Sequence, residues 1–452
     1  MSLPAPNPTK QADGLTTMDL GAVLPQTAEV KDGHLHVGGV DMVKLARREG
    51  TALIVFDEAD LRTRMTQYVE AFADCYPAPT HVAYASKAFL NKEVVRMANE
   101  LGMSLDVSGG GEFACAQAVD FPVERVIVHG NNKTPQELEE AISAQVGCIV
   151  VDSSDELARI SRLAGEMGVT QSVYLRVTPG VEADTHEYIR TGCEDSKFGF
   201  TMKDDIAFAA VRDALAAPNV RLTGLHCHIG SQIFALHSFR EAVKVMVDFM
   251  ARIKAELGYE IDELDLGGGL GIAYMSTDAP STIREFAEMT CGSVKEACEE
   301  AGVKLPVLSV EPGRSLVANA GITLYTVGTL KHLEGIRNIA AIDGGMSDNI
   351  RPALYGSEYE AIIANKADQP RNAVYTLVGK HCESGDYVVA DGSIQQPEVG
   401  DVACVFATGA YCTTMASTYN GNPRPAIVFV RDGQARVVTR RETYADLWAR
   451  DL

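Results

Sequence analysis

Lys87 is the residue whose surroundings most suggest covalent chemistry. It follows the apolar run 81–86, which is typical of a β-strand, and precedes a helix-like stretch that begins at Ala88. A lysine at the inner end of a buried strand is costly to hold as a free ammonium. That cost disappears if the amine forms a Schiff base with a carbonyl cofactor, although a strand-end lysine can also simply reach the surface.

Two histidines, His226 and His228, end another apolar run. Alternate residues of a strand share a face, so the pair could bind a metal ion. The sequence shows no third ligand of the right kind, and we therefore predict no metal site.

A glycine run, Gly267-Gly268-Gly269, follows a third strand-like segment. It is not a dinucleotide-binding fingerprint, because Ile272 stands where the last glycine should be. Glycines still let backbone N–H groups approach an anion closely, so the run is compatible with a phosphate cradle.

Glu311 and Arg314 follow a further strand-like run in the stretch Glu311-Pro312-Gly313-Arg314. The two side chains could merely pair with each other. In a functional interpretation, Glu311 faces a ring nitrogen and favours its protonated form, while Arg314 faces a carboxylate or a phosphate.

The elements that must position these residues form a regular alternation. Short apolar runs rich in Val, Ile and Leu are typical of strands buried on both faces, and amphipathic stretches of helical period separate most of them. The predicted strands are the run ending at Lys87, then Met103–Val107, Glu124–His129, Cys148–Asp152, Ser172–Thr178, Arg221–Ile229, Glu263–Leu266 and Val307–Val310. Eight strands over about 230 residues indicate a (β/α)8 barrel with its chemistry at the C-terminal strand ends. A doubly wound open sheet is the alternative, since a strand count cannot show closure.

Three helices are predicted most clearly, at Thr134–Ala144, Ser154–Met167 and Phe239–Leu257. Thr134 and Ser154 are each followed by an acidic first turn, which is typical of helix N-caps.

The two ends of the chain differ from this pattern. We expect residues 1–16 to form a mobile tail, 17–47 to contribute a strand at His34–Val40 to a β domain, 48–318 to form the barrel, and 319–452 to form that all-β domain. Its predicted strands are Ile322–Leu330, Ile336–Ile342, Ala373–Gly379, Tyr387–Val389, Val402–Phe406 and Ala426–Val430. Turns are predicted at Asp343-Gly344-Gly345, Asp391-Gly392 and Asp432-Gly433.

Composition excludes several classes of protein. A chain of 452 residues with 46% hydrophobic content can bury cores in two domains. The net charge of −21 argues against a nucleic-acid partner. No apolar run approaches a membrane span and no signal-peptide pattern is present, so we expect no membrane association. Ten cysteines without a Cys-x-x-Cys pair suggest reduced thiols in the cytoplasm.

Several motifs occur in order along nearly the whole chain. They are Tyr84-Ala85-Ser86-Lys87-Ala88, His186-x-Tyr188-Ile189-x-Thr191-Gly192, Ser196-Lys197-Phe198-Gly199, His226-x-His228-Ile229-Gly230-Ser231-Gln232, Gly267-Gly268-Gly269, Glu311-Pro312-Gly313-Arg314, Arg351-Pro352-Ala353-Leu354-Tyr355 and Cys382-Glu383-Ser384-Gly385-Asp386. Jointly they resemble the fold-type III pyridoxal-phosphate-dependent decarboxylases, and within them the diaminopimelate decarboxylases. That family has a (β/α)8 barrel and a β domain.

The resemblance implies a role for each matched residue. Lys87 would hold pyridoxal 5'-phosphate through its amine, His228 would stack on the ring and Glu311 would pair with the pyridine nitrogen. Phosphate-binding and other cofactor-binding residues would be Ser231, Gly268, Gly269, Gly313, Arg314 and Tyr411. Substrate-binding residues would be Arg314, Arg351, Tyr355, Glu383 and Tyr411. Cys382 would donate the proton that replaces CO2, from a homodimer whose active sites are shared.

The substrate implied is meso-2,6-diaminopimelate, which would yield L-lysine and CO2 in the last step of lysine biosynthesis. Holding a diamino diacid calls for arginines and hydroxyls at its carboxylates, which Arg314, Arg351 and Tyr355 would supply, and Glu383 could take the distal ammonium. One departure is Ser108, which stands one position away from the serine of the family's usual Asp-Val-Val-Ser-Gly-Gly-Glu. It leaves open a related decarboxylase of a siderophore or antibiotic precursor.

Two other classes are alternatives. A pyridoxal-phosphate racemase shares the barrel and the β domain, but the motif at Cys382 favours decarboxylation. A catalytically inactive regulatory homologue would lack the lysine or the proton donor, and this chain has both Lys87 and Cys382.

Overall fold

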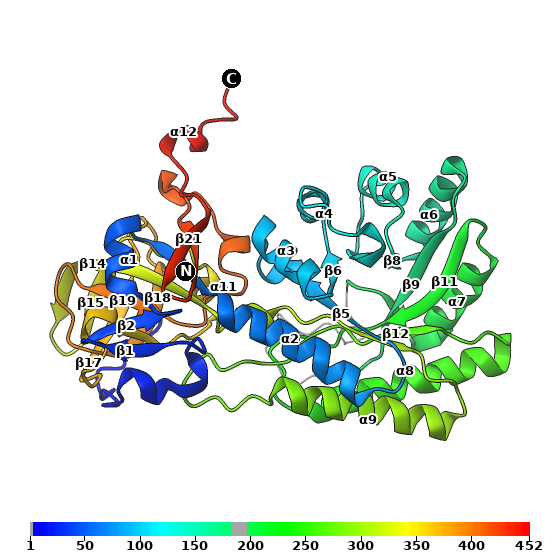
Figure 1. The fold of residues 1–452 in the computed structure, drawn as a ribbon, viewed down its shortest axis with the longest axis horizontal. Helices are drawn as coiled ribbons and strands as arrows, with labels where there is room; N and C mark the ends of the chain where they lie inside the picture. Colours follow the sequence, from blue (N-terminus) through cyan, green and yellow to red (C-terminus); the bar gives the residue numbers. More distant parts are fainter. Residues whose placement is uncertain (1–2, 182–196) are drawn as a thin grey trace. The chain divides into compact units, whose positions relative to one another are not determined.

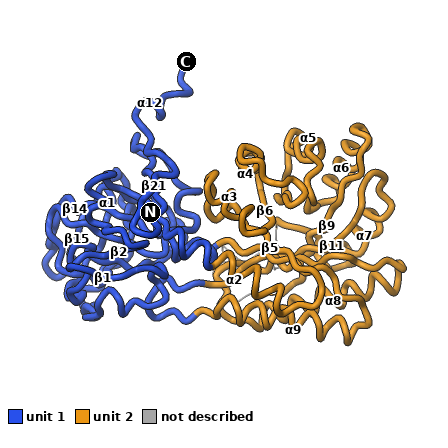
Figure 2. The backbone as a smooth tube through the Cα atoms, in the orientation of Figure 1, with its two compact units in different colours: residues 1–63, 272–279, 314–452 blue, residues 64–271, 280–313 orange. Residues whose placement is uncertain are grey.

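The computed structural model describes residues 3–181 and 197–452. The chain divides into two compact units, coloured separately in Figure 2. Unit 2 contains residues 64–271 and 280–313, and unit 1 contains residues 1–63, 272–279 and 314–452.

Unit 2 is a closed parallel β-barrel. Its strands are β5 (Thr80–Ala85), β6 (Ser104–Val107), β7 (Val126–Val128), β8 (Cys148–Val151), β9 (Gln171–Thr178), β11 (Val220–His226), β12 (Glu263–Asp265) and β13 (Val307–Val310). Neighbouring strands pair in the order β9-β11-β12-β13-β5-β6-β7-β8, and β8 pairs again with β9. This last pairing closes the ring, so the predicted barrel is confirmed and the open-sheet alternative is wrong.

Helices flank the barrel strands, as Figure 1 shows. They are α3 (Lys92–Glu100), α4 (Gly110–Gln117), α5 (Pro135–Ala144), α6 (Ser154–Met167), α7 (Ile206–Ala216), α8 (Leu236–Leu257) and α9 (Ile283–Ala301); α2 (Glu58–Cys75) begins in unit 1 and ends in unit 2. Thr134 caps α5 in a capping box with Glu137, as predicted. The prediction for α6 is wrong by one residue, because the hydroxyl of Ser153, not Ser154, accepts the backbone N–H of Glu156.

Unit 1 is built on a mixed sheet in the order β18-β17-β15-β14-β4-β20-β21, with β19 pairing β14 and β16. Its strands are β4 (Leu53–Asp57), β14 (Gly321–Leu333), β15 (Arg337–Ile342), β16 (Ala361–Ile363), β17 (Ala373–Val378), β18 (Tyr387–Ile394), β19 (Val402–Val405), β20 (Ala426–Arg431) and β21 (Gln434–Thr439). Short helices are α1 (Met42–Glu49), α10 (Arg314–Val317), α11 (Arg351–Tyr355) and α12 (Tyr444–Leu447).

The N-terminal segment differs from the expectation. His34–Val37 (β2) pairs with β1 (Glu29–Lys31) and β3 (Val40–Asp41) in a separate three-stranded sheet. It joins unit 1 through its apolar face, because Leu35 and Val37 are buried in the unit 1 core. The strand that completes the large sheet is β4, which we assigned to the barrel and which pairs with β14 and β20.

Two further local predictions differ from the structure. Residues 3–16 form no helix or strand, yet they lie against unit 1, where Asp13 pairs with the buried Arg371. Asp391-Gly392 is not a turn between strands but lies inside β18, where Asp391 has φ +44° and the register with β17 shifts. Asp432-Gly433 does form the turn between β20 and β21.

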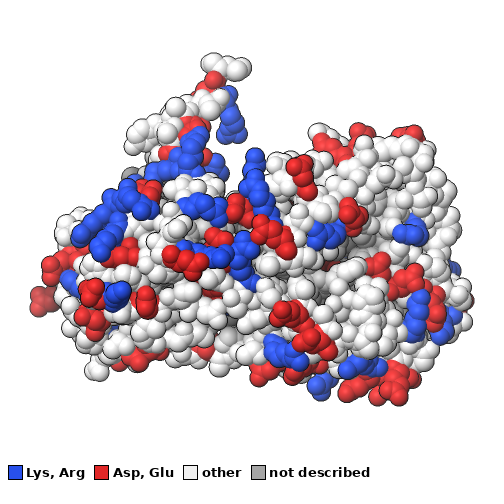
Figure 3. All heavy atoms as spheres, in the orientation of Figure 1, with Lys and Arg blue, Asp and Glu red and all other residues white. Residues whose placement is uncertain are grey.

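Among residues 3–181 and 197–452, no helix combines the length and the apolarity needed to cross a membrane. The face drawn in Figure 3 carries acidic and basic side chains interspersed.

Candidate active site

Lys87 lies in a 3-10 turn, Ser86–Ala88, immediately after β5. Its amine is 3.6 Å from Oδ2 of Asp106 at the end of β6, and its side chain is 43% exposed. The turn therefore carries Lys87 off the end of the strand, and its amine is not enclosed in the core. The turn is packed closely against the chain after β13, where a Cβ at Gly313 would lie 3.1 Å from the Cβ atoms of both Ala85 and Ala88.

Asp106 and His129 were not predicted as site residues, yet they lie beside Lys87 and Glu311. Asp106 is 1% exposed, and its Oδ1 is 3.8 Å from Nε2 of His129, which follows β7. Within the described part of the chain, neither carboxylate oxygen of Asp106 has a hydrogen-bond partner. Their positions at C-terminal ends of barrel strands are the signal that could have identified them.

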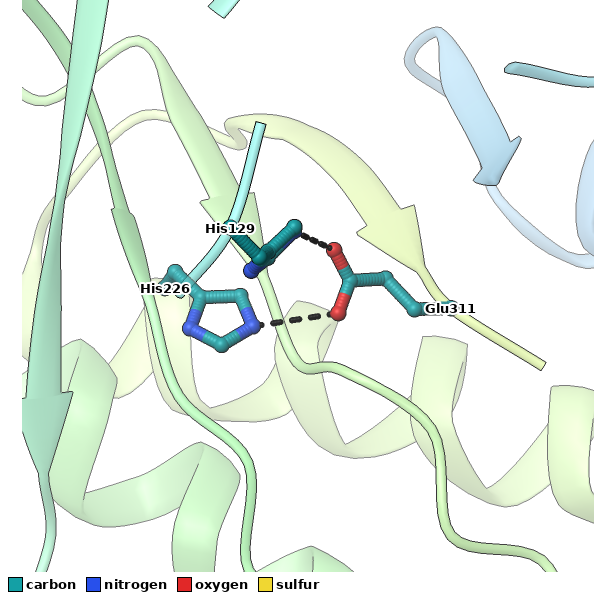
Figure 4. Close-up of side chains that lie close together, drawn as sticks. All are labelled: His129, His226 and Glu311. Carbon is teal, nitrogen blue, oxygen red and sulfur yellow. Dashed lines mark hydrogen bonds and ion pairs between the residues drawn. The ribbon is translucent and has the colours of Figure 1, made fainter. Parts of the chain in front are cut away.

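The carboxylate of Glu311 lies between two imidazoles (Figure 4). Its Oε1 is 2.6 Å from Nε2 of His129, and its Oε2 is 3.1 Å from Nε2 of His226. Burial favours the neutral acid, but the two histidines outweigh it and hold the pKa of Glu311 well below its usual value. Burial lowers the pKa of His226 to about 4, so a neutral His226 faces an ionised Glu311 at neutral pH.

These three residues are also a set that could bind a metal ion. This set differs from the pair considered in the sequence analysis, because it contains His226 but not His228. Two ligand atoms of one zinc ion, each about 2.1 Å from it in tetrahedral geometry, lie about 3.4 Å apart. The 2.6 Å separation of His129 Nε2 and Glu311 Oε1 is instead that of a direct imidazole–carboxylate contact.

The glycine run after β12 approaches neighbouring backbone too closely for side chains. A Cβ at Gly268 would lie 2.2 Å from the carbonyl oxygen of Glu311, and one at Gly269, which has φ +127°, would lie 2.5 Å from that of Gly230. Ser231 follows Gly230 in the adjoining loop after β11 and is half-buried. The loops after β11, β12 and β13 thus meet through bare backbone, as a phosphate cradle requires.

His228 lies in the same region, because a Cβ at Gly267 would fall 2.8 Å from its Nδ1. Burial, followed by the charges of Lys87 and Arg176, holds the pKa of His228 well below its usual value. A neutral imidazole suits stacking on an aromatic ring.

Unit 2 therefore contains groups suited to each part of pyridoxal phosphate. They comprise an amine for the aldehyde, an ionised carboxylate for the ring nitrogen and a glycine cradle for the phosphate. The buried Asp106 carboxylate that lacks hydrogen-bond partners is consistent with a cationic or N–H-bearing group arriving beside it.

In unit 1, a pair of buried arginines shares one tyrosine hydroxyl. The hydroxyl of Tyr274 accepts hydrogen bonds from Arg314 at 2.5 Å and from Arg351 at 2.7 Å. Arg351 also bonds Tyr359 at 2.8 Å, and the guanidinium of Arg314 lies 4.9 Å from the ring centre of Tyr411. We call Arg314, Arg351, Tyr274 and Tyr359 the arginine–tyrosine cluster.

The sequence analysis missed Tyr274 and Tyr359. It assigned the hydroxyl to Tyr355, which lies half-buried at the end of α11. Paired guanidinium groups are suited to carboxylates and phosphates, so the cluster can recognise an acidic ligand.

Cys382 and Glu383 lie in the turn between β17 and β18. Cys382 is exposed and Glu383 is half-buried. The backbone N–H of Cys382 donates to Oδ1 of Asn420 at 2.8 Å. The motif residues His186, Tyr188, Ile189, Thr191, Gly192 and Ser196 lie outside the described part of the chain.

Comparison with known proteins identifies the family. Residues 58–318 match the pyridoxal-dependent decarboxylases, over their pyridoxal-binding domain. The chain is 45% identical over 420 residues to the diaminopimelate decarboxylase of Bacillus subtilis (strain 168), covering 93% of this chain and 95% of the relative. The chain belongs to the diaminopimelate decarboxylases.

Further diaminopimelate decarboxylases agree with this placement. The protein from Mycobacterium tuberculosis (strain H37Rv) is 44% identical over 424 residues, which cover 92% of this chain and 94% of that one. A crystal structure of the diaminopimelate decarboxylase from M. jannaschii in complex with L-lysine superposes with a TM-score of 0.89 at 36% identity, over 95% of this chain and 98% of that chain. These relatives are decarboxylases, so the racemase alternative has no support among them.

Proposed function

We propose that this chain removes one carboxyl group of meso-2,6-diaminopimelate as CO2, with pyridoxal 5'-phosphate as cofactor, and releases L-lysine. The observation that carries the proposal is the grouping of Lys87, Asp106 and the histidine-bound Glu311 at one edge of a closed barrel. In the biosynthesis of lysine, this reaction is the last step.

Pyridoxal phosphate, when bound, supplies an electron sink that stabilises the negative charge left on the α-carbon as CO2 departs. Lys87 would hold the cofactor through its amine. Glu311, ionised between His129 and His226, would face the pyridine nitrogen and favour its protonated form, which would keep the ring an electron acceptor. His228 would stack on the ring. Phosphate binding is assigned to Ser231, to the backbone of Gly268 and Gly269, and to Tyr411, and Gly313 is assigned as a further cofactor-binding residue.

Unit 1 supplies the groups that select the substrate. We assign Arg314 to carboxylate or phosphate binding and Arg351 to substrate carboxylate binding. Tyr355 and Tyr411 are assigned as further substrate contacts, and Glu383 is assigned to the distal ammonium. A carboxylate that enters the arginine–tyrosine cluster finds guanidinium N–H groups already oriented by Tyr274 and Tyr359. This preorganisation favours a diacid over a simple diamine precursor.

Cys382 then donates the proton that replaces CO2. We propose further that it does so in the site of a partner subunit, so that the working enzyme is at least a homodimer. The nine free cysteines among the described residues are consistent with a cytoplasmic location.

The experiment that tests the function is incubation of the purified, cofactor-loaded protein with meso-diaminopimelate. The expected result is stoichiometric release of CO2 and L-lysine. Lysine, ornithine and arginine serve as controls and should release no CO2. Turnover of a control amino acid in preference to diaminopimelate would redirect the proposal to another decarboxylase of the fold.

A further inference from the structure

A buried chain of hydrogen bonds links Ser347, His381 and Asp386 in unit 1. Nε2 of His381 lies 2.9 Å from Oγ of Ser347, and Nδ1 lies 2.7 Å from Oδ2 of Asp386. Each residue is less than a tenth exposed. The reaction described above uses none of them.

Asp386 is fixed in place by the backbone. Its Oδ1 accepts the N–H of Met346 at 2.6 Å, and its Oδ2 accepts the N–H of His381 at 2.8 Å. A Cβ at Gly379 would lie 2.1 Å from this carboxylate, and one at Gly345 would lie 2.4 Å from it. Two glycines thus make room for a carboxylate that is closely enclosed, so His381 is bound to a rigid anchor.

The order serine, histidine, aspartate is also that of a hydrolytic triad. A nucleophilic serine must reach a substrate carbonyl, whereas Ser347 is 3% exposed. The burial of Ser347 excludes that use in this conformation and leaves a positioning role.

The hydrogen-bonded residues position the turn that carries Cys382. His381 precedes Cys382, and its ring stacks on that of Tyr419 at 5.8 Å with an interplanar angle of 10°. The hydroxyl of Tyr419 donates to the carbonyl oxygen of Cys382 at 3.4 Å, and Asn420 accepts the N–H of Cys382. Both backbone groups of the exposed cysteine are therefore held by a segment that packs on His381.

We propose that His381 is a positioning residue for Cys382: through Asp386, Ser347 and Tyr419 it holds the turn from which the thiol donates its proton. This inference rests on the proposed function, because it assumes that Cys382 is the donor. A proton donor on an exposed turn samples many positions, and a misplacement of about 1 Å can cost about 100-fold in rate.

A double-mutant cycle on kcat tests the inference. In the holoenzyme, His381→Ala should lower kcat about tenfold or more and leave KM within about twofold. In a Cys382→Ala background the same change should alter the residual kcat by less than about twofold, because there is no thiol left to position. His381→Asn, whose amide can replace Nδ1–H toward Asp386, should recover part of the loss. His332→Ala, which removes an exposed histidine of unit 1, is the matched control and should match the wild type.

Amide hydrogen exchange of the cofactor-free protein supplies a second measurement. In His381→Ala and in the milder Ser347→Ala, the amides of His381 and Cys382 should exchange faster by about tenfold or more, while those of β17 keep their wild-type rates. Unchanged exchange in the turn, or effects of His381→Ala and Cys382→Ala on kcat that multiply, would overturn the inference alone. Full kcat in the single variant Cys382→Ala would overturn the proposed role of Cys382 and this inference with it.

Discussion

Nε2 of His129 lies 2.6 Å from Oε1 of Glu311, and both side chains are buried in the barrel. A buried carboxylate stays ionised only if its oxygens are paired or hydrogen-bonded, and here His129 and His226 each lie against one of them. Residues that need not touch the cofactor therefore keep Glu311, the cofactor-facing acid of the proposed site, ionised.

The first prediction follows from this contact. His129→Ala should destabilise the cofactor-free protein by about 1–3 kcal/mol, because Oε1 of Glu311 loses its partner. Urea unfolding gives the value. In a Glu311→Gln background the charge is absent, so the cost of the same change should be smaller. An equal loss of unfolding free energy in both backgrounds would show that it comes from the cavity left by the imidazole and not from the His129–Glu311 pair.

The second prediction concerns Lys87. Lys87→Ala should abolish turnover and the covalent cofactor adduct that borohydride reduces. The fold should survive, since the side chain of Lys87 is 43% exposed and is not part of the packed core, although its partner Asp106 is buried. Mass spectrometry after borohydride and circular dichroism check the two parts. Lys92→Ala, at an exposed position in the first turn of α3, is the control and should keep the adduct. A reducible adduct in the Lys87→Ala protein would move the attachment site elsewhere.

The third prediction concerns the arginine–tyrosine cluster. Arg351→Ala should lower kcat/KM for diaminopimelate by about 100-fold, or about 3 kcal/mol, the size of a lost charge-assisted contact. Cofactor content, read from the visible spectrum, should remain normal. Arg424→Ala removes an exposed arginine of the same unit and should leave kinetics unchanged. Wild-type kinetics in Arg351→Ala would contradict the substrate assignment but not decarboxylation itself.

The fourth prediction tests the shared site. Cys382→Ala should slow turnover strongly and keep the cofactor bound. Mixing it with the inactive Lys87→Ala chain should restore part of the activity, because a heterodimer contains one site with both native residues. Steady-state assays measure the activity of the mixture before and after subunit exchange has been confirmed. If exchange occurs and activity does not return, Cys382 acts within its own chain or outside catalysis.

The fifth prediction is a pH dependence of stability. Burial raises the pKa of Asp348 to about 6 from an ordinary value of 3.8. A raised pKa in the folded state means that the group favours folding at low pH, and that its contribution is lost as pH rises through about 6. Between pH 4 and pH 7 the wild type should therefore lose up to about 3 kcal/mol relative to Asp348→Asn, as urea unfolding at the two pH values would measure. Parallel profiles for the two proteins would show that Asp348 does not titrate in this range.

The sequence alone determined where the barrel strands lie and which residues end them. Strands buried on both faces must be short apolar runs, so β5 to β9 and β11 to β13 were found to within a few residues. Lys87, Glu311 and the glycine run follow such strands, and their chemistry is legible from type and position. Asp391-Gly392 shows the limit of local signals, because a residue with positive φ serves equally in a turn or in a bulge within a strand.

Only the tertiary structure decided whether the barrel closes and which distant side chains become neighbours. Pairing of β8 with β9 closes the barrel, and β4 leaves the barrel region to pair with β14 and β20. Two side-chain pairs of the site join distant segments. His129 and Glu311 are 182 residues apart in the sequence, and Tyr274 and Arg351 are 77 residues apart. The sequence pattern indicates which residues of each segment are buried. The side chain that pairs with a buried charge, by contrast, depends on the packing of the whole unit.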